Sequence, residues 1–321
     1  MTPLIAHELA RPDATIRYWA SPEPVSSSAP TLVLLHGATL DHRAWDVQVA
    51  ALQQSHPLVV PDLRAHGEST GDFTFRAAVD DVSALLDILP ADDVVLIGLS
   101  LGANIAQELV RQEPGRFQAL VLADATCNNA AHPPMAAAMG ISALRWQALV
   151  AGSGFADQVA RATANDPAAR QYARAANAHR SNEETIDILA SLLTHALRPD
   201  PGYRLPVPTL LMHGEDDSIG DIRSATARWA RREPLAEYAV IPAAGHTSNL
   251  DNPAAFTAVL QEFLGRVAPS GKSLEAIAER LYARYGSRPW ELLPEATREH
   301  FRGLVEAGID GTGAPLLEQV G

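Results

Sequence analysis

The sequence predicts an α/β fold in which a mostly parallel sheet is flanked by helices. Short apolar runs of strand length recur along the chain, and stretches with helical periodicity separate them. Several of these runs end directly in glycine, histidine or aspartate. Unbroken apolar runs are typical of parallel strands buried on both faces, and their alternation with helices is the pattern of an α/β sheet.

The individual elements can be predicted in chain order. One or two antiparallel edge strands are expected within residues 1–20, where residues 14–19 alternate most clearly. The expected strands are residues 31–35, 58–61, 94–97, 120–123, 209–213 and 238–241, of which 31–35 and 94–97 are expected to be buried. The expected helices are residues 43–53, 75–89, 101–109, 222–231 and 253–267, and apolar residues form a stripe on 75–89 and a helix face on 101–109.

The strongest chemical signal is the Gly98-Leu99-Ser100-Leu101-Gly102 turn, which directly follows the strand expected at 94–97. The spacing of apolar residues after the turn is that of a helix face, so Ser100 lies where a strand becomes a helix. Such a sharp turn strains the serine backbone and requires neighbours without bulk, which Gly98 and Gly102 supply. This pattern predicts a nucleophile elbow. A serine that only caps the helix is the alternative.

Two backbone amides are expected to bind a developing oxyanion beside Ser100. One is that of Leu101, at the positive end of the helix that follows the serine. The other is that of Ala38, because Gly37 follows the strand 31–35 and lets the loop turn sharply towards a ligand. His36 is interpreted as a structural residue that braces this loop.

Two later strands end in groups that could complete the chemistry of Ser100. The first leads into Gly214-Glu215-Asp216-Asp217, and the second leads into Gly245-His246. The chain order is therefore serine, acid and histidine, with each group at the carboxyl end of a strand. That order is the one expected of a hydrolase catalytic triad.

Composition limits the partners and the location of the protein. The chain has 321 residues and a formal net charge of −13, which argues against nucleic acid and anionic membranes as partners. Lys272 is the only lysine, so Schiff-base chemistry is not expected, and the single cysteine, Cys127, excludes an internal disulfide. No apolar run approaches the roughly 18 residues of a membrane span, and residues 1–7 lack the pattern of a secretion signal. A cytoplasmic protein is expected.

Strand and helix alternation stops between residues 127 and 201, which suggests a helical cap, or lid, over the active site. This segment contains the arginines Arg145, Arg161, Arg170 and Arg174. They are interpreted mainly as part of a solvated helix face; binding of a substrate carboxylate is the alternative. The polar loop 62–69 is expected to be held by Asp–Arg hydrogen bonds rather than by a metal, because its residues lack tetrahedral Cys/His spacing.

Over roughly residues 30–267 the chain resembles proteins of the α/β-hydrolase fold. The motifs that carry the resemblance are Leu35-His36-Gly37, Pro61 to Ser69, Gly98 to Gly102, Gly214 to Asp217 and Gly245-His246. The family pattern implies that Asp217 is the triad acid; Asp216 stays open, and Asp124 occupies another family position for the acid. The early segment is similar to 3-oxoadipate enol-lactonases and related esterases. Alanines replace family glycines at positions 65 and 103, which are small departures.

The order of the predicted elements divides the chain into a core of residues 1–126 and 202–268, a helical cap of residues 127–201 and a small C-terminal helical appendage of residues 269–321, which does not belong to the hydrolase pattern. The expected activity is hydrolysis of a small-molecule ester or lactone by Ser100, Asp217 and His246, without a metal or an organic cofactor. Carbon–carbon bond hydrolysis, perhydrolase chemistry and a non-catalytic small-ligand receptor remain alternatives. In the appendage, helices are expected near 274–282 and 294–305, with Trp290 and Leu293 packing them together or against the core. The appendage could serve in packing, in binding a partner or in forming a homo-oligomer.

Overall fold

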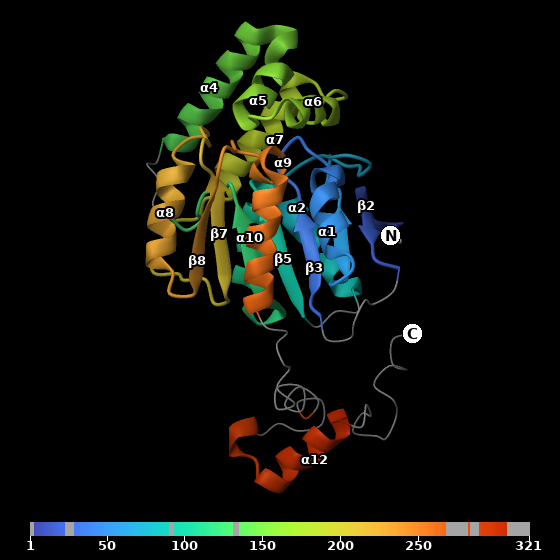
Figure 1. The fold of residues 1–321 in the computed structure, drawn as a ribbon. Helices are drawn as coiled ribbons and strands as arrows, with labels where there is room; N and C mark the ends of the chain where they lie inside the picture. Colours follow the sequence, from blue (N-terminus) through green and yellow to red (C-terminus); the bar gives the residue numbers. More distant parts are fainter. Residues whose placement is uncertain are drawn as a thin grey trace. The chain divides into compact units, whose positions relative to one another are not determined.

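A computed structural model describes residues 3–22, 29–89, 93–130, 135–267, 282 and 289–306 of the chain (Figure 1). The described strands are β1 (Ile5–Arg11), β2 (Ala14–Ala20), β3 (Thr31–Leu35), β4 (Leu58–Pro61), β5 (Val94–Leu99), β6 (Phe117–Ala123), β7 (Thr209–Gly214) and β8 (Ala236–Ile241). They form one sheet in the order β1-β2-β4-β3-β5-β6-β7-β8. The pairs β1–β2 and β2–β4 are antiparallel, and the other neighbouring strands are parallel. The prediction of a mostly parallel sheet with antiparallel edge strands is confirmed.

Helices cover both faces of this sheet. One face carries α1 (Asp46–Leu52) and α10 (Pro253–Arg266), and the other carries α2 (Phe75–Ile88), α3 (Leu101–Gln112) and α8 (Ile222–Arg232). Successive side chains of a strand point to opposite faces, so Leu32 and Leu34 of β3 pack on the first side and Val33 and Leu35 on the second. All four of these side chains are fully buried, in keeping with the unbroken apolar run of residues 32–35.

Short helical turns join these elements and reflect local sequence signals. They are η1 (His42–Trp45), η2 (Pro114–Arg116) and α9 (Ser248–Asp251). At α2, the Thr74 side chain accepts a hydrogen bond from the amide of Ala77, and α10 begins with Pro253 after its capping residue Asn252. The helix expected at 43–53 is therefore a 3-10 turn followed by α1.

A helical segment lies between β6 and β7 and comprises α4 (Ala136–Ala151), η3 (Gly152–Gly154), α5 (Phe155–Thr163), α6 (Pro167–Ala176) and α7 (Asn182–His195). It lies over the carboxyl-end edge of the sheet (Figure 1). Polar contacts attach it to loops of that edge. The Tyr172 hydroxyl donates to Asp41 Oδ1 at 3.0 Å, and the Arg180 guanidinium donates to the carbonyl oxygen of Ala65 at 2.7 Å.

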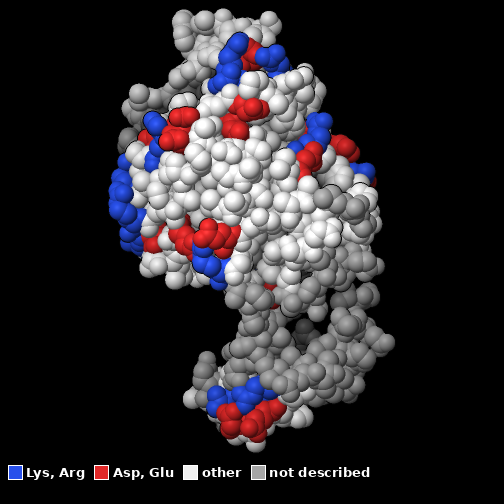
Figure 2. Space-filling view, in the orientation of Figure 1, with Lys and Arg blue, Asp and Glu red and all other residues white. Residues whose placement is uncertain are grey.

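The chain forms two compact units, Met1–Val267 and Ala268–Gly321. In the second unit the described elements are η4 (Trp290–Leu292) and α12 (Glu295–Glu306), and Trp290 and Leu293 pack with Tyr282 and Phe301. Most of the helix expected near 274–282 lies outside the described residues. Oppositely charged side chains gather on α12 (Figure 2), where Glu295 forms ion pairs with Arg298 and Arg302. None of the helices in the described ranges combines the length and hydrophobicity that crossing a bilayer demands.

Candidate active site

Ser100 lies between β5 and α3 with a backbone φ of 50° and ψ of −111°, a region that a non-glycine residue rarely adopts. Its amide donates to the carbonyl oxygen of Ala123 at 2.8 Å, which ties the turn to the neighbouring strand. A side chain at Gly98 would place its Cβ 2.4 Å from the nitrogen of Ala103, and one at Gly102 would lie 2.1 Å from the carbonyl oxygen of Leu35. The two glycines are therefore required by close backbone packing.

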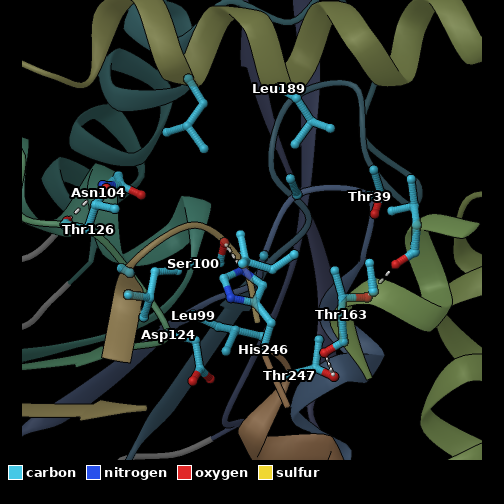
Figure 3. A pocket seen from close by; sticks show the side chains of 18 of the residues that line it. Thr39, Leu99, Ser100, Asn104, Asp124, Thr126, Thr163, Leu189, His246 and Thr247 are labelled. Atoms are coloured by element: carbon cyan, nitrogen blue, oxygen red, sulfur yellow. Dashed lines mark hydrogen bonds between the residues drawn. The ribbon is translucent and has the colours of Figure 1, made fainter. Parts of the chain in front are cut away.

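The structure brings Ser100, His246 and Asp217 together from three separate loops. His246 Nε2 lies 2.9 Å from Ser100 Oγ, and His246 Nδ1 lies 2.9 Å from Asp217 Oδ2. A carboxylate can only accept, so Nδ1 carries the proton donated to Asp217 and Nε2 is left to accept the serine hydroxyl proton. Figure 3 shows the imidazole of His246 beside Ser100.

The surroundings of His246 favour its protonated form. Burial of the ring opposes a positive charge, but the hydrogen bond and negative charge of Asp217, with the charge of Asp124, outweigh it. As a result the pKa of His246 is raised above its ordinary value of 6.5. A base with a raised pKa holds a captured proton more tightly.

The alternative acids occupy different environments. Asp216 is exposed and accepts from the side-chain amide of Asn165 at 3.1 Å. Asp124 is fully buried, but it accepts from the amide of Gly214 at 2.8 Å and from the hydroxyl of Ser248 at 2.5 Å. Burial raises the pKa of Asp124 to about 7, against the smaller opposing effects of His246 and the Ser248 hydrogen bond. Of these three carboxylates, only that of Asp217 is hydrogen-bonded to His246.

The two expected oxyanion donors are the amides of Leu101 and Ala38. Leu101 is the first residue of α3, so its amide has no carbonyl partner within the helix. Ala38 lines the same cavity as Ser100, on the loop after β3. The next residue, Thr39, has a φ of 64°, and its amide donates to His66 Nε2 at 3.1 Å, which fixes the course of this loop.

His36 also braces the loops around the serine. Its Nδ1 donates to the carbonyl oxygen of Gly37 at 2.8 Å, and its Nε2 accepts from the amide of Leu63 at 3.0 Å. Burial lowers the pKa of His36, so the ring is neutral. At Gly37 the protein itself leaves room for a side chain, because an added Cβ would meet its nearest protein atoms at an ordinary 3.5 Å.

A cavity of about 460 Å³ opens above Ser100 and His246. Its floor comes from the carboxyl-end loops of the sheet, and its roof comes from α4, α5 and α7, with Leu189 above the serine (Figure 3). Its volume is within the range of small-molecule sites.

Comparison with known proteins now identifies the family. A family model described as the alpha/beta hydrolase family matches residues 32–259. The chain belongs to the alpha/beta hydrolase family. The predicted fold class and family resemblance are confirmed.

Three relatives of this alpha/beta hydrolase illustrate the range of the family. The pimeloyl-[acyl-carrier protein] methyl ester esterase of Nitrosospira multiformis is 28% identical over 263 residues, which cover 73% of this chain and 94% of the relative. The 2-succinyl-6-hydroxy-2,4-cyclohexadiene-1-carboxylate synthase of an Enterobacter species is 32% identical, with coverages of 73% and 92%. The crystal structure of the enol-lactonase from Burkholderia xenovorans is similar to this one, with a TM-score of 0.68 and 24% sequence identity. The match covers 81% of this chain and 100% of that chain, and it supports a shared fold.

The polar loop at 62–69 of this alpha/beta hydrolase differs in detail from the expectation. Asp62 bonds to the amides of His42 and Glu68, both at 2.7 Å, rather than to an arginine of the loop. Arg64 is buried, and its guanidinium donates to two aspartates outside the loop, Asp81 and Asp13. Asp–Arg bonds therefore attach this loop to other elements, because the partners of Arg64 are distant in sequence.

Within the described ranges, one group of side chains has metal-ligand atoms within 4.8 Å of each other: Asp41, His42 and Asp62. These atoms already have protein partners. Asp41 accepts two bonds from the Arg43 guanidinium, and His42 Nδ1 lies 2.9 Å from Asp62 Oδ1. The arrangement fits a hydrogen-bonded brace of the loops better than a metal centre, since cation ligation would break those contacts.

Sequence reasoning missed Asp251, which holds the loop that carries His246. One carboxylate oxygen accepts from the amide of Gly245 at 2.7 Å, and the carboxylate also accepts from the amides of Asn165 and Asp166 at 2.9 and 2.8 Å. The histidine loop is thereby joined to the α5–α6 turn of the helical segment. No local motif marks such a residue, because its three partners are backbone amides.

Proposed function

We propose that this alpha/beta hydrolase is a serine hydrolase that cleaves a carboxylic ester or lactone of a small molecule through an acyl-enzyme. The observation that carries the proposal is the pair of 2.9 Å hydrogen bonds linking Ser100, His246 and Asp217 at the floor of the cavity. That relay is the arrangement that activates a serine hydroxyl, which is a weak nucleophile at its free pKa.

In the first half of the reaction, His246 Nε2 takes the proton of Ser100 as the serine oxygen attacks the substrate carbonyl carbon. Asp217 accepts from Nδ1, keeps the ring in the productive tautomer and stabilises the imidazolium that forms. The imidazolium then gives its proton to the leaving alcohol oxygen. The raised pKa of His246 assists the first of these transfers.

The amides of Ala38 and Leu101 would bind the oxyanion of each tetrahedral intermediate. Loss of one such donor typically lowers kcat by about 10²–10³-fold. In the second half, a water molecule attacks the acyl carbonyl, and His246 serves as its base and then returns the proton to Ser100. The acid is released, and every proton and electron pair is accounted for by the residues present.

The relatives support an ester-cleaving enzyme, since one of them is named a methyl ester esterase. A second candidate is favoured by the relative named as a synthase, which is 32% identical. In that case the three residues would serve a reaction other than ester hydrolysis, such as cleavage of a carbon–carbon bond. Turnover of a vinylogous diketone, with none across a panel of esters and lactones, would favour it.

The proposal is tested with a fluorophosphonate probe and short 4-nitrophenyl esters. Ser100→Ala is expected to keep its fold, judged by circular dichroism, and to lose both labelling and ester hydrolysis. The matched control is Ser218→Ala, because Ser218 also lines the cavity and should leave labelling intact. Substantial hydrolysis by Ser100→Ala would refute the serine mechanism, and failure of the probe to label the wild-type protein would favour a receptor.

A further inference from the structure

We infer that the cavity selects an uncharged, largely apolar ester or lactone and rejects a substrate that would place a carboxylate inside it. This inference rests on the proposed function and adds the chemical class of the substrate. It follows from the composition of the cavity wall and from where the nearby cations are bound.

The wall is predominantly aliphatic. The helical segment contributes Leu144 from α4, Val159 from α5, and Leu189, Leu192 and Leu193 from α7. The sheet side adds further aliphatic residues, which are Leu40, Leu99, Ile219 and Ile222. A substrate that fills this space loses contact with water on most sides and gains apolar contact in return.

No lysine or arginine is among the described residues that line the cavity. Its ionisable side chains are Asp124 and His246, and both belong to the floor. Asp124 can only add negative charge, while His246 is bonded to Ser100 and Asp217. An anionic group would therefore meet no cation among these lining residues, and it would meet one acid of its own sign.

The arginines of the helical segment are held elsewhere. Arg161 and Arg174 both form ion pairs with Asp157, and Arg170 donates to the carbonyl oxygen of Ala164 at 2.7 Å. Arg180 is bound to the carbonyl oxygen of Ala65. Arg145 is exposed on α4 and does not line the cavity. The alternative that these arginines grip a substrate carboxylate is thus not supported by their positions.

The polar side chains that do line the cavity are neutral. Gln147 and Gln158 are exposed at the rim, where an amide can donate to or accept from an uncharged polar group. Asn104 is occupied, because its amide nitrogen donates to Asn128 Oδ1 and to the carbonyl oxygen of Thr126. This wall can therefore accept a substrate that carries an uncharged polar group at its outer end.

The test compares three 4-nitrophenyl esters with acyl chains of six carbons: the hexanoate, the adipate half-ester with a free carboxylate, and its ω-carboxamide. The last two differ in charge but hardly in shape. We expect kcat/KM to fall only modestly from hexanoate to carboxamide and by at least about 100-fold from carboxamide to carboxylate, because an unpaired charge is costly to bury. Hydrolysis by Ser100→Ala supplies the background.

Gln147→Arg adds a cation at the rim and should raise kcat/KM for the carboxylate at least about 10-fold relative to the carboxamide. Gln147→Met is the matched control, since it changes the side chain without adding charge and should leave the preference as it was. Equal kcat/KM for carboxylate and carboxamide in the wild type would overturn the inference.

Binding of the same esters to Ser100→Ala, measured by calorimetry, separates this inference from the proposed function. Tighter binding of the neutral esters, without turnover by the wild type, would refute the hydrolase and retain the selectivity. Turnover with equal binding and equal kcat/KM would retain the hydrolase and refute the selectivity.

Discussion

Replacement of Gly102 by alanine should destabilise the core of the protein strongly. The added Cβ would lie 2.1 Å from the carbonyl oxygen and 2.6 Å from the carbonyl carbon of Leu35. Even a contact of 3.0 Å, which is already too short, would require a backbone shift of about 0.9 Å (3.0 − 2.1) at Leu35, which is fully buried in β3. Overpacking of this kind costs about 3 kcal/mol. In a unit of this size we therefore expect Tm to fall by about 6–12 °C.

Thermal unfolding followed by circular dichroism measures this effect, and Gly37→Ala is the matched control. An added Cβ at position 37 meets its nearest atoms at 3.5 Å, so the change in stability should stay within about 1 kcal/mol. Ester hydrolysis should also be lost in Gly102→Ala, because the displaced turn carries Ser100 and the Leu101 amide. A Gly102→Ala protein as stable as the wild type, or a Gly37→Ala protein as unstable as Gly102→Ala, would refute this reasoning.

Three further predictions concern the groups around His246. Because its pKa is raised and the ring must be neutral to act as a base, kcat/KM should rise with pH through a midpoint above 6.5. Asp217→Asn should lower kcat by about 10⁴-fold and move that midpoint to lower pH. Asp124→Asn should lower kcat far less. A larger loss of kcat in Asp124→Asn than in Asp217→Asn would make Asp124 the functional acid. Asp251→Ala frees the amide of Gly245 and should lower kcat by at least about 10-fold, with little change in KM. Asp251→Asn keeps one accepting oxygen, so its kcat should lie between those of the wild type and Asp251→Ala. A wild-type kcat in Asp251→Ala would show that the hydrogen bonds of Asp251 do not position the histidine.

The sequence alone was sufficient to predict the sheet, the sharp turn at Ser100 and the family. These features depend on local patterns, such as the apolar run of β5, the glycines around Ser100 and the glycine before His246. Each pattern is set by a few consecutive residues whose backbone must turn or pack closely in one way. Chain order then indicated that the groups at the ends of β5, β7 and β8 would meet, because parallel strands present their carboxyl ends at one edge.

Only the tertiary structure distinguished the acids and described the cavity. Asp216 and Asp217 are adjacent in sequence, yet one is exposed and the other is closed to solvent and bonded to His246. No local signature marked the hydrogen bonds of Asp251, the distant partners of Arg64 or the neutral cavity wall. The physical reason is that a hydrogen bond or an ion pair is decided by which atoms meet across the fold, whereas a turn or a buried strand is decided by the residues that compose it.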